Sequence, residues 1–136
     1  MGMLMLCFLM FEIEKQDTIV DLDQLKWKNR IVLFFPKEKE FDYDFTDSLL
    51  VEIKDRKIVY IIFNEEIESN REVNISDKYL NELTSKYKMG SRKDCWILIG
   101  LDGGVKLKEE SKPDWRLILQ TVDTMPMRIR ETRNNL

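Results

Sequence analysis

Short runs of apolar residues in the middle of the chain indicate buried β-strands. The first covers residues 31–35 and stops at Pro36, and the second covers residues 58–63. Runs of this length without polar alternation are typical of strands that are buried on both faces. A third apolar run, at residues 95–101, predicts another strand of the same kind.

The charged segment 37–56 carries an apolar residue at every fourth position from Phe41 to Ile53. This spacing places the apolar residues on one face of a helix, and Asp42 or Asp44 is a suitable residue to cap its start. The resulting order of strand, helix and strand predicts a parallel crossover.

Two further helices are expected in the second half of the chain. The first extends from a cap at Ser76 to Tyr87, with Gly90 as the stop. The second begins at Pro113, because proline is tolerated in the first turn of a helix, and it is broken at Pro126.

Asp102-Gly103 is a strong signal for a type I′ hairpin that joins strand 95–101 to an antiparallel strand at 105–108. The polar segment 64–74 is expected to be a loop. Together these elements predict an α/β fold with a central mixed sheet of about four strands and helices on both faces.

The length of 136 residues suits one domain, which we place at residues 13–136. The preceding segment, residues 1–12, is apolar and too short to span a bilayer. It is either a truncated or weak export signal, an edge strand packed on the core, or a membrane or lipid anchor. An exported or envelope-associated location is slightly favoured over a cytoplasmic one.

Composition narrows the possible chemistry. With 43% apolar and 35% charged residues the chain can bury a core, and a net charge of −3 gives no reason to expect nucleic acid as a partner. Histidine is absent, and the only cysteines are Cys7 and Cys95. We therefore expect no His-dependent catalysis, no metal site and no cofactor.

Several segments together resemble a known family. They are Trp27-Lys-Asn-Arg30 before the first strand, the hairpin with Asp102 and Gly103, and a C-terminal stretch with Asp123, Met125, Pro126, Met127 and Arg128. The chain resembles a thioredoxin-like domain family of unknown function. That family occurs in small bacterial proteins, often exported, and in animal sushi-repeat and related extracellular-matrix proteins. The resemblance covers roughly residues 25–133.

The resemblance implies a thioredoxin-like or peroxiredoxin-like fold and, by analogy of fold, redox activity. However, the segment 36–41 after the first strand contains neither the C-x-x-C motif nor any other thiol. Alignment of the hairpin places Cys95 near the position where thioredoxins carry a cis-proline. Cys95 is either a relocated reactive thiol beside Arg92 and Lys93 or, as we favour, a buried strand cysteine.

The residues that carry the resemblance have two interpretations. They are either structural, with Asp123 paired to Arg30 or Arg128, or they form a binding surface. The absence of His and of a redox motif favours a non-catalytic interaction or stress-related domain with a protein partner. The alternative is a peroxiredoxin-like or thioredoxin-like oxidoreductase that uses Cys95. Membrane contact is expected only through the N-terminal apolar segment.

Overall fold

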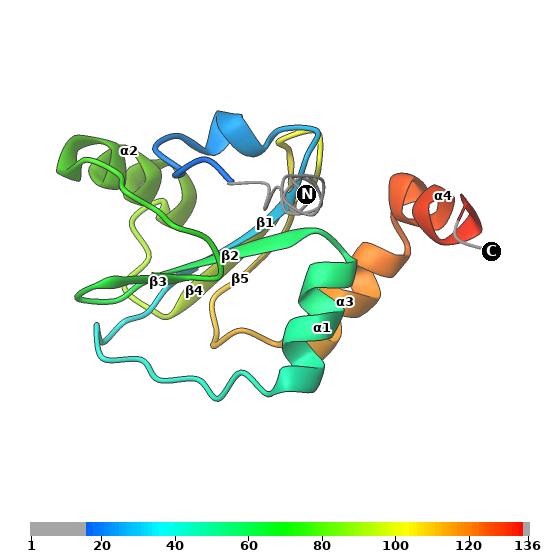
Figure 1. Ribbon diagram of the computed structural model, residues 1–136. Coiled ribbons are helices and arrows are strands. Elements are labelled where there is room, and N and C mark those ends of the chain that lie inside the picture. Colours follow the sequence, from blue (N-terminus) through cyan, green and yellow to red (C-terminus); the bar gives the residue numbers. More distant parts are fainter. Residues whose placement is uncertain (1–15, 135–136) are drawn as a thin grey trace, which may run out of the picture.

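The described part of the chain, residues 16–134 of a computed structural model, forms an α/β domain around one mixed sheet (Figure 1). The strand order is β3-β2-β1-β4-β5. β1 and β2 are parallel, and the other neighbouring strands are antiparallel. The strands are β1 (Arg30–Phe35), β2 (Ile58–Phe63), β3 (Ile67–Ser69), β4 (Cys95–Ile99) and β5 (Val105–Glu109).

Helices cover both faces of the sheet, as the sequence predicts (Figure 1). They are the short 3-10 helix η2 (Leu22–Leu25) and the α-helices α1 (Asp47–Asp55), α2 (Asp77–Lys88), α3 (Trp115–Asp123) and α4 (Pro126–Asn134). The side chains of β1 alternate between the two faces. Ile31, Leu33 and Phe35 pack with η2 and α2, whereas Val32 and Phe34 pack with α1 and α3.

The sheet has five strands, so the prediction of about four was too low. The additional strand, β3, lies in the segment 64–74 that was expected to be a loop. It has only three residues and one apolar side chain, Ile67, so it leaves no periodic signal. Asn70, directly after β3, extends the pairing of β3 with β2. The Asn70 side chain accepts from Tyr60 N–H (3.0 Å) and donates to the Ile58 carbonyl (2.9 Å).

The helix predicted within 37–56 is shorter than expected. α1 begins after an N-cap at Thr46, whose hydroxyl accepts from Leu49 N–H at 3.2 Å, so neither Asp42 nor Asp44 is the cap. The preceding segment is not helical. Its aromatic residues alternate at every second position and pack on the face that α1 and α3 cover; they are Phe41, Tyr43 and Phe45.

The hairpin between β4 and β5 lies where it was predicted but is of another type. A type I′ turn needs a positive φ at both central residues, and at Asp102-Gly103 only Gly103 has one (82°). Gly103 N–H donates to the Gly100 carbonyl (3.0 Å), and the register shifts beside the turn. This is a three-residue loop with a bulge, so the prediction of type I′ was wrong.

The remaining helix boundaries follow the sequence closely. Ser76 caps α2, as predicted, and the chain breaks at Pro126, where α4 begins. Asp114 rather than Pro113 leads into α3, because its side chain accepts from Leu117 N–H at 3.1 Å. Segment 1–12, with the predictions made for it, lies outside the described residues. No helix within 16–134 is both long and apolar enough to cross a bilayer.

Candidate functional site

A groove of about 420 Å³ lies beside the start of β1, between the β4–β5 turn and the junction of α3 with α4. Its lining contains most of the residues singled out in the sequence. We call it the Trp27 groove; it is lined by Trp27, Arg30, Gly100, Leu101, Asp102, Lys106, Met125, Pro126 and Met127. Three segments that are far apart in the sequence therefore build one surface feature.

Trp27 forms one wall of the groove in an unusual backbone conformation. Its φ is 67°, a left-handed value that is costly for a bulky residue. The conformation is held by the hydrogen bond from Trp27 N–H to the Leu101 carbonyl, at 2.6 Å. The side chain is 60% exposed, so burial in the core does not explain why tryptophan stands here.

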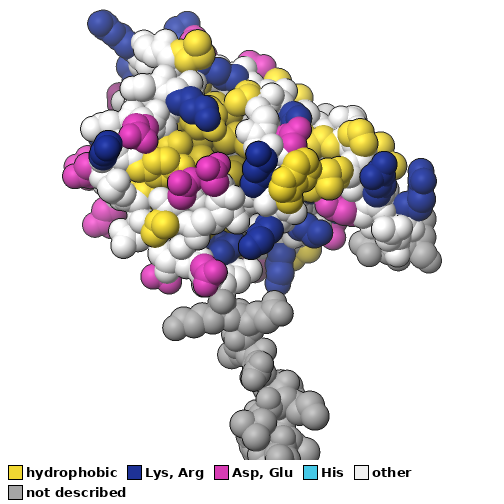
Figure 2. Space-filling model, turned by 90° about the horizontal axis from the view of Figure 1, so that it is seen from above, with side chains coloured by type: hydrophobic (Ala, Val, Ile, Leu, Met, Phe, Trp, Pro, Cys, Tyr) yellow, Lys and Arg dark blue, Asp and Glu magenta, His cyan; other side chains and the backbone are white. Residues whose placement is uncertain are grey.

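The opposite wall is formed where α4 begins. Met125, Pro126 and Met127 line the groove, and Met127 is 42% exposed. Methionine side chains are flexible and polarisable, so they adapt to ligands of different shape. Figure 2 shows hydrophobic side chains gathered on the side of the molecule towards α4, next to Lys and Arg side chains.

Asp102 and Lys106 form the polar rim of the groove. Asp102 accepts from Gly104 N–H and from Lys106 Nζ, both at 2.9 Å, and these bonds lower the pKa of its carboxyl. Gly100 leaves room for this arrangement, because a Cβ there would lie 2.6 Å from Lys106 Cε. The rim is thus a fixed ion pair close to an apolar wall.

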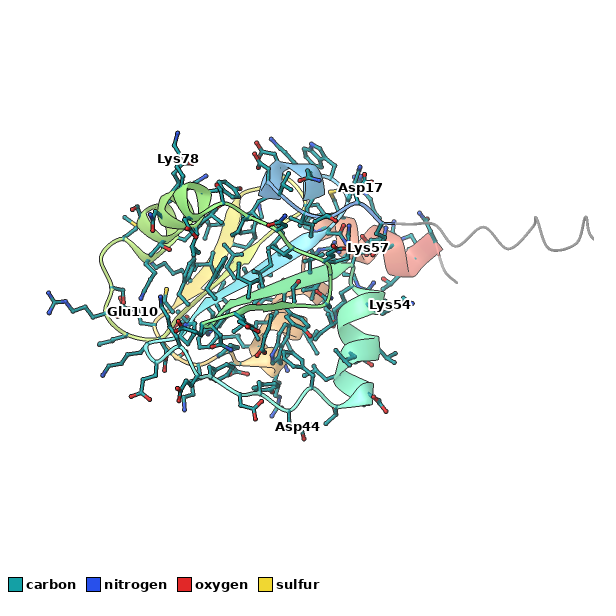
Figure 3. All side chains as sticks on the ribbon, turned by 60° about the vertical axis from the view of Figure 1, so that its left-hand side comes forward. Asp17, Asp44, Lys54, Lys57, Lys78 and Glu110 are labelled. Atoms are coloured by element: carbon teal, nitrogen blue, oxygen red, sulfur yellow. The ribbon has the colours of Figure 1, made fainter. Side chains whose placement is uncertain are left out.

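Arg30 is a lining residue of a different kind, because its side chain is fully buried. Its Nη1 donates to the Arg56 carbonyl (2.9 Å) and to Glu131 (3.3 Å). Burial lowers the pKa of the Arg30 guanidinium, and the charge of Glu131 opposes this effect. Lys57, which directly precedes β2 and is labelled in Figure 3, also lies 3.9 Å from Glu131.

Behind the groove, a network of ion pairs joins α1 to α3 and α4. Arg56 holds Asp123 through two bonds of 2.9 Å, and these bonds lower the pKa of the Asp123 carboxyl. Arg128 is buried and donates to Asp55 at 2.6 Å. Of the two pairings expected for Asp123, the one with Arg128 is present at 3.5 Å, whereas Arg30 pairs with Glu131.

Comparison with protein families assigns the chain. Residues 21–131 match the family described as a domain of unknown function, DUF4174, and this range includes every residue of the groove and of the network behind it. The chain belongs to the DUF4174 family. No curated protein and no solved structure matches the chain.

Cys95 lies at the other end of the DUF4174 sheet. It begins β4 and pairs with Phe35, the last residue of β1, whereas the Trp27 groove lies at the start of β1. The side chain is fully buried, and burial raises the pKa of the thiol. The peptide bonds of residues 16–134 are all trans, so none here matches the cis-proline of thioredoxins.

A polar pocket of about 370 Å³ occupies this end of the domain. Lys37 N–H donates to Asp94 across it at 2.7 Å, and Phe41 and Lys112 also line it. Within the described ranges no group of three His, Cys, Asp or Glu side chains is placed to hold a metal ion.

Sequence reasoning missed several residues of the site. Lys106 joins the rim because the bulge in β5 sets its position, and a bulge is not visible in the hydrophobic pattern. Arg56 belongs to the ion-pair network, yet it stands in a charged segment with no distinguishing motif. Glu131 lies in the C-terminal stretch that carries the family resemblance, but nothing in the sequence assigns it as the partner of Arg30. The positive φ at Trp27 likewise has no signal in the sequence, because glycine or asparagine is the usual residue there.

Proposed function

We propose that this DUF4174 domain is a non-catalytic, thioredoxin-like interaction domain whose binding site is the Trp27 groove. The strand order supports the thioredoxin-like assignment. β2-β1-β4-β5, with only β1 and β2 parallel, is the order that the thioredoxin-like resemblance leads one to expect. β3 is then an addition at the edge of that core.

One observation carries the proposal: an exposed tryptophan, held in a costly left-handed conformation, forms the wall of an apolar groove. Strained backbone conformations persist where the surrounding structure enforces them, and they cluster at binding and active sites. Tryptophan and methionine are also enriched at the centres of protein interfaces. These properties favour binding over catalysis.

The size and chemistry of the groove indicate the type of partner. A volume of about 420 Å³ is within the range of small-molecule and peptide-side-chain pockets. The walls are apolar, and the rim is the Asp102–Lys106 ion pair. We expect a short extended peptide segment with apolar side chains, so that the apolar atoms enter the groove and the backbone meets the polar rim.

A titration followed by NMR tests this proposal. A synthetic mixture of random apolar tripeptides is added to the ¹⁵N-labelled full chain. We expect the indole signal of Trp27 and the amide signals of Leu101 and Met127 to shift, whereas the amide signals of Asp94 and Phe41, at the other end, stay unchanged. Shifts confined to Asp94 and Phe41, or no shifts at all, would contradict the proposal.

A further inference from the structure

The floor of the Trp27 groove holds a cation that is only partly satisfied. Arg30 uses Nη1 for its bonds to the Arg56 carbonyl and Glu131. Its other two donor groups, Nε and Nη2, have no acceptor anywhere in residues 16–134, although both are buried. Buried donors without a partner are rare in folded proteins, so each one calls for an explanation.

The surrounding charges do not supply the missing acceptor. Glu131 is engaged on the Nη1 side, and Asp123 is held by Arg56 and Arg128. Burial lowers the pKa of Arg30 because the guanidinium has lost more solvation than its partners restore. A ligand acceptor that reached Arg30 from the groove would therefore find two unpaired donors, Nε and Nη2.

The start of α4 adds a second feature that favours a negative charge at the same place. The first hydrogen bond of this helix runs from Ile129 N–H to the Met125 carbonyl at 3.0 Å. The amides of Met127 and Arg128 come before that bond, so α4 provides them with no acceptor of its own. The positive end of the helix thus lies at the wall of the groove that Met125, Pro126 and Met127 form.

We propose that the Trp27 groove recognises a carboxylate on an apolar ligand, and that Arg30 Nε and Nη2 donate the pair of hydrogen bonds that hold it. This inference rests on the proposed function, since it names the chemical group that the groove selects. A carboxylate has two oxygens in one plane, which match two adjacent guanidinium donors. The apolar body of the ligand lies against Trp27, Leu101 and Met127.

A monoanion fits the local charge better than a phosphate. Glu131 already places one negative charge next to Arg30, so it would repel a second negative charge on the ligand. Lys106 neutralises Asp102 at 2.9 Å, which leaves the approach to Arg30 nearly neutral. The C-terminus of a peptide and a free fatty or amino-acid carboxylate share this chemistry.

The experiment compares two probes of nearly the same shape, of which one is a carboxylate and the other its neutral amide. The wild-type full chain is titrated with N-acetyl-L-leucine and with N-acetyl-L-leucinamide, and the Arg30 Nε–H signal is followed by NMR. We expect the carboxylate to bind at least about tenfold more tightly than the amide and to shift the Arg30 signal. Equal affinity for both probes, or an unmoved Arg30 signal at saturation, would overturn the inference.

Further probes separate the possible outcomes. Hexanoate bound as tightly as N-acetyl-L-leucine would support a free carboxylic acid as the source, and weaker hexanoate would support a peptide C-terminus. The tripeptides are also tested in two forms, with a free C-terminal carboxylate and with a C-terminal amide. If both forms shift the groove signals equally, the groove binds peptides but the carboxylate inference fails. If no probe shifts any groove signal, the proposed function fails as well.

Substitution of Arg30 gives an independent check. Arg30→Lys keeps the charge but loses the pair of adjacent donors, so we expect about a tenfold loss of affinity for N-acetyl-L-leucine with little change for the amide. Arg71→Lys, at an arginine that donates to the Asp17 carbonyl away from the groove, is the matched control. Unchanged carboxylate affinity in folded Arg30→Lys would contradict the inference. If the variant does not fold, the comparison of probes on the wild type decides.

Discussion

At the scale of single residues, Trp27 combines a strained backbone with an exposed side chain. A left-handed residue other than glycine costs roughly 1–2 kcal/mol. A tryptophan that is 60% exposed still buries some apolar area, which offsets the strain by a similar amount at about 25 cal/mol per Å². The two effects nearly cancel, so stability gives little reason to keep tryptophan at this position.

We therefore expect Trp27→Gly to change the free energy of unfolding by less than about 1 kcal/mol, whereas loss of a buried tryptophan costs about 3–5 kcal/mol. Binding of apolar tripeptides is expected to be lost. Met89→Gly is the control, because Met89 is also left-handed (φ 52°) and 77% exposed but lies at the end of α2. Urea unfolding measures both variants, and a large destabilisation by Trp27→Gly would assign the residue to packing.

Cys95 shows the opposite combination, a reactive type of side chain in an inert environment. Burial raises the pKa of its thiol, so the thiolate is scarce near neutral pH and the side chain is shielded. In a Cys7→Ser variant, we expect iodoacetamide to label the folded protein much more slowly than the urea-unfolded protein at pH 7.5. Labelling at similar rates in both states would show that the thiol is accessible, and would revive the oxidoreductase alternative.

At the scale of elements, the ion pair between Arg56 and Asp123 joins the end of α1 to the end of α3. The folded state lowers the pKa of Asp123, chiefly through the bonds from Arg56, so the unfolded state binds the proton more readily. Asp123 therefore stabilises the fold above the ordinary carboxyl pKa of about 3.9, and this contribution is lost as the pH falls below it.

Because Asp123 is about half exposed, we expect Asp123→Asn to cost no more than about 1 kcal/mol at pH 7. The cost is expected to shrink as the pH falls from about 4 to about 2, because the wild-type carboxylate, with its lowered pKa, becomes protonated only there. Urea unfolding across this range measures it, with the exposed Asp44, labelled in Figure 3, replaced by Asn as the control. If wild type and Asp123→Asn lost stability in parallel as the pH falls, this result would contradict the stabilising role of the Arg56–Asp123 pair.

The elements also show what the sequence can and cannot predict. Strands β1, β2 and β4 were predictable because long apolar runs identify buried strands directly. The start of α1 was not, because Phe41, Phe45, Leu49 and Ile53 satisfy the spacing of a helix. The alternation of Phe41, Tyr43 and Phe45 was the better signal, since it follows the period of extended chain, and Thr46 marks the boundary.

The site was predictable only in part. Most of the residues that carry the family resemblance line one groove, although the sequence left open whether they were structural or formed a binding surface. Tertiary structure divides them between these roles. Arg128 and Asp123 belong to the ion-pair network, whereas Trp27 and Met127 are exposed in the groove. Such a division depends on burial and pairing, which no linear pattern records.

At the scale of the whole molecule, the two ends of the sheet differ in chemistry. The end that follows β1 carries the Lys37–Asp94 hydrogen bond and a buried cysteine. The end that precedes β1 carries the Trp27 groove and the ion-pair network. In Figure 3, Glu110 and Lys57 mark opposite ends of the domain. The fold thus places the apolar Trp27 groove and the unsatisfied donors of Arg30 at the end away from Cys95.

The central claim is that ligands bind at the Trp27 groove, and fluorescence quenching tests it most directly. Trp96 and Trp115 are buried, so acrylamide quenching reports on Trp27. We expect saturating apolar tripeptides to reduce the quenching constant at least twofold. A Trp27→Phe variant, whose remaining tryptophans Trp96 and Trp115 are buried, should show no such change on addition of the tripeptides. Unchanged quenching of Trp27 in the wild type would contradict the claim.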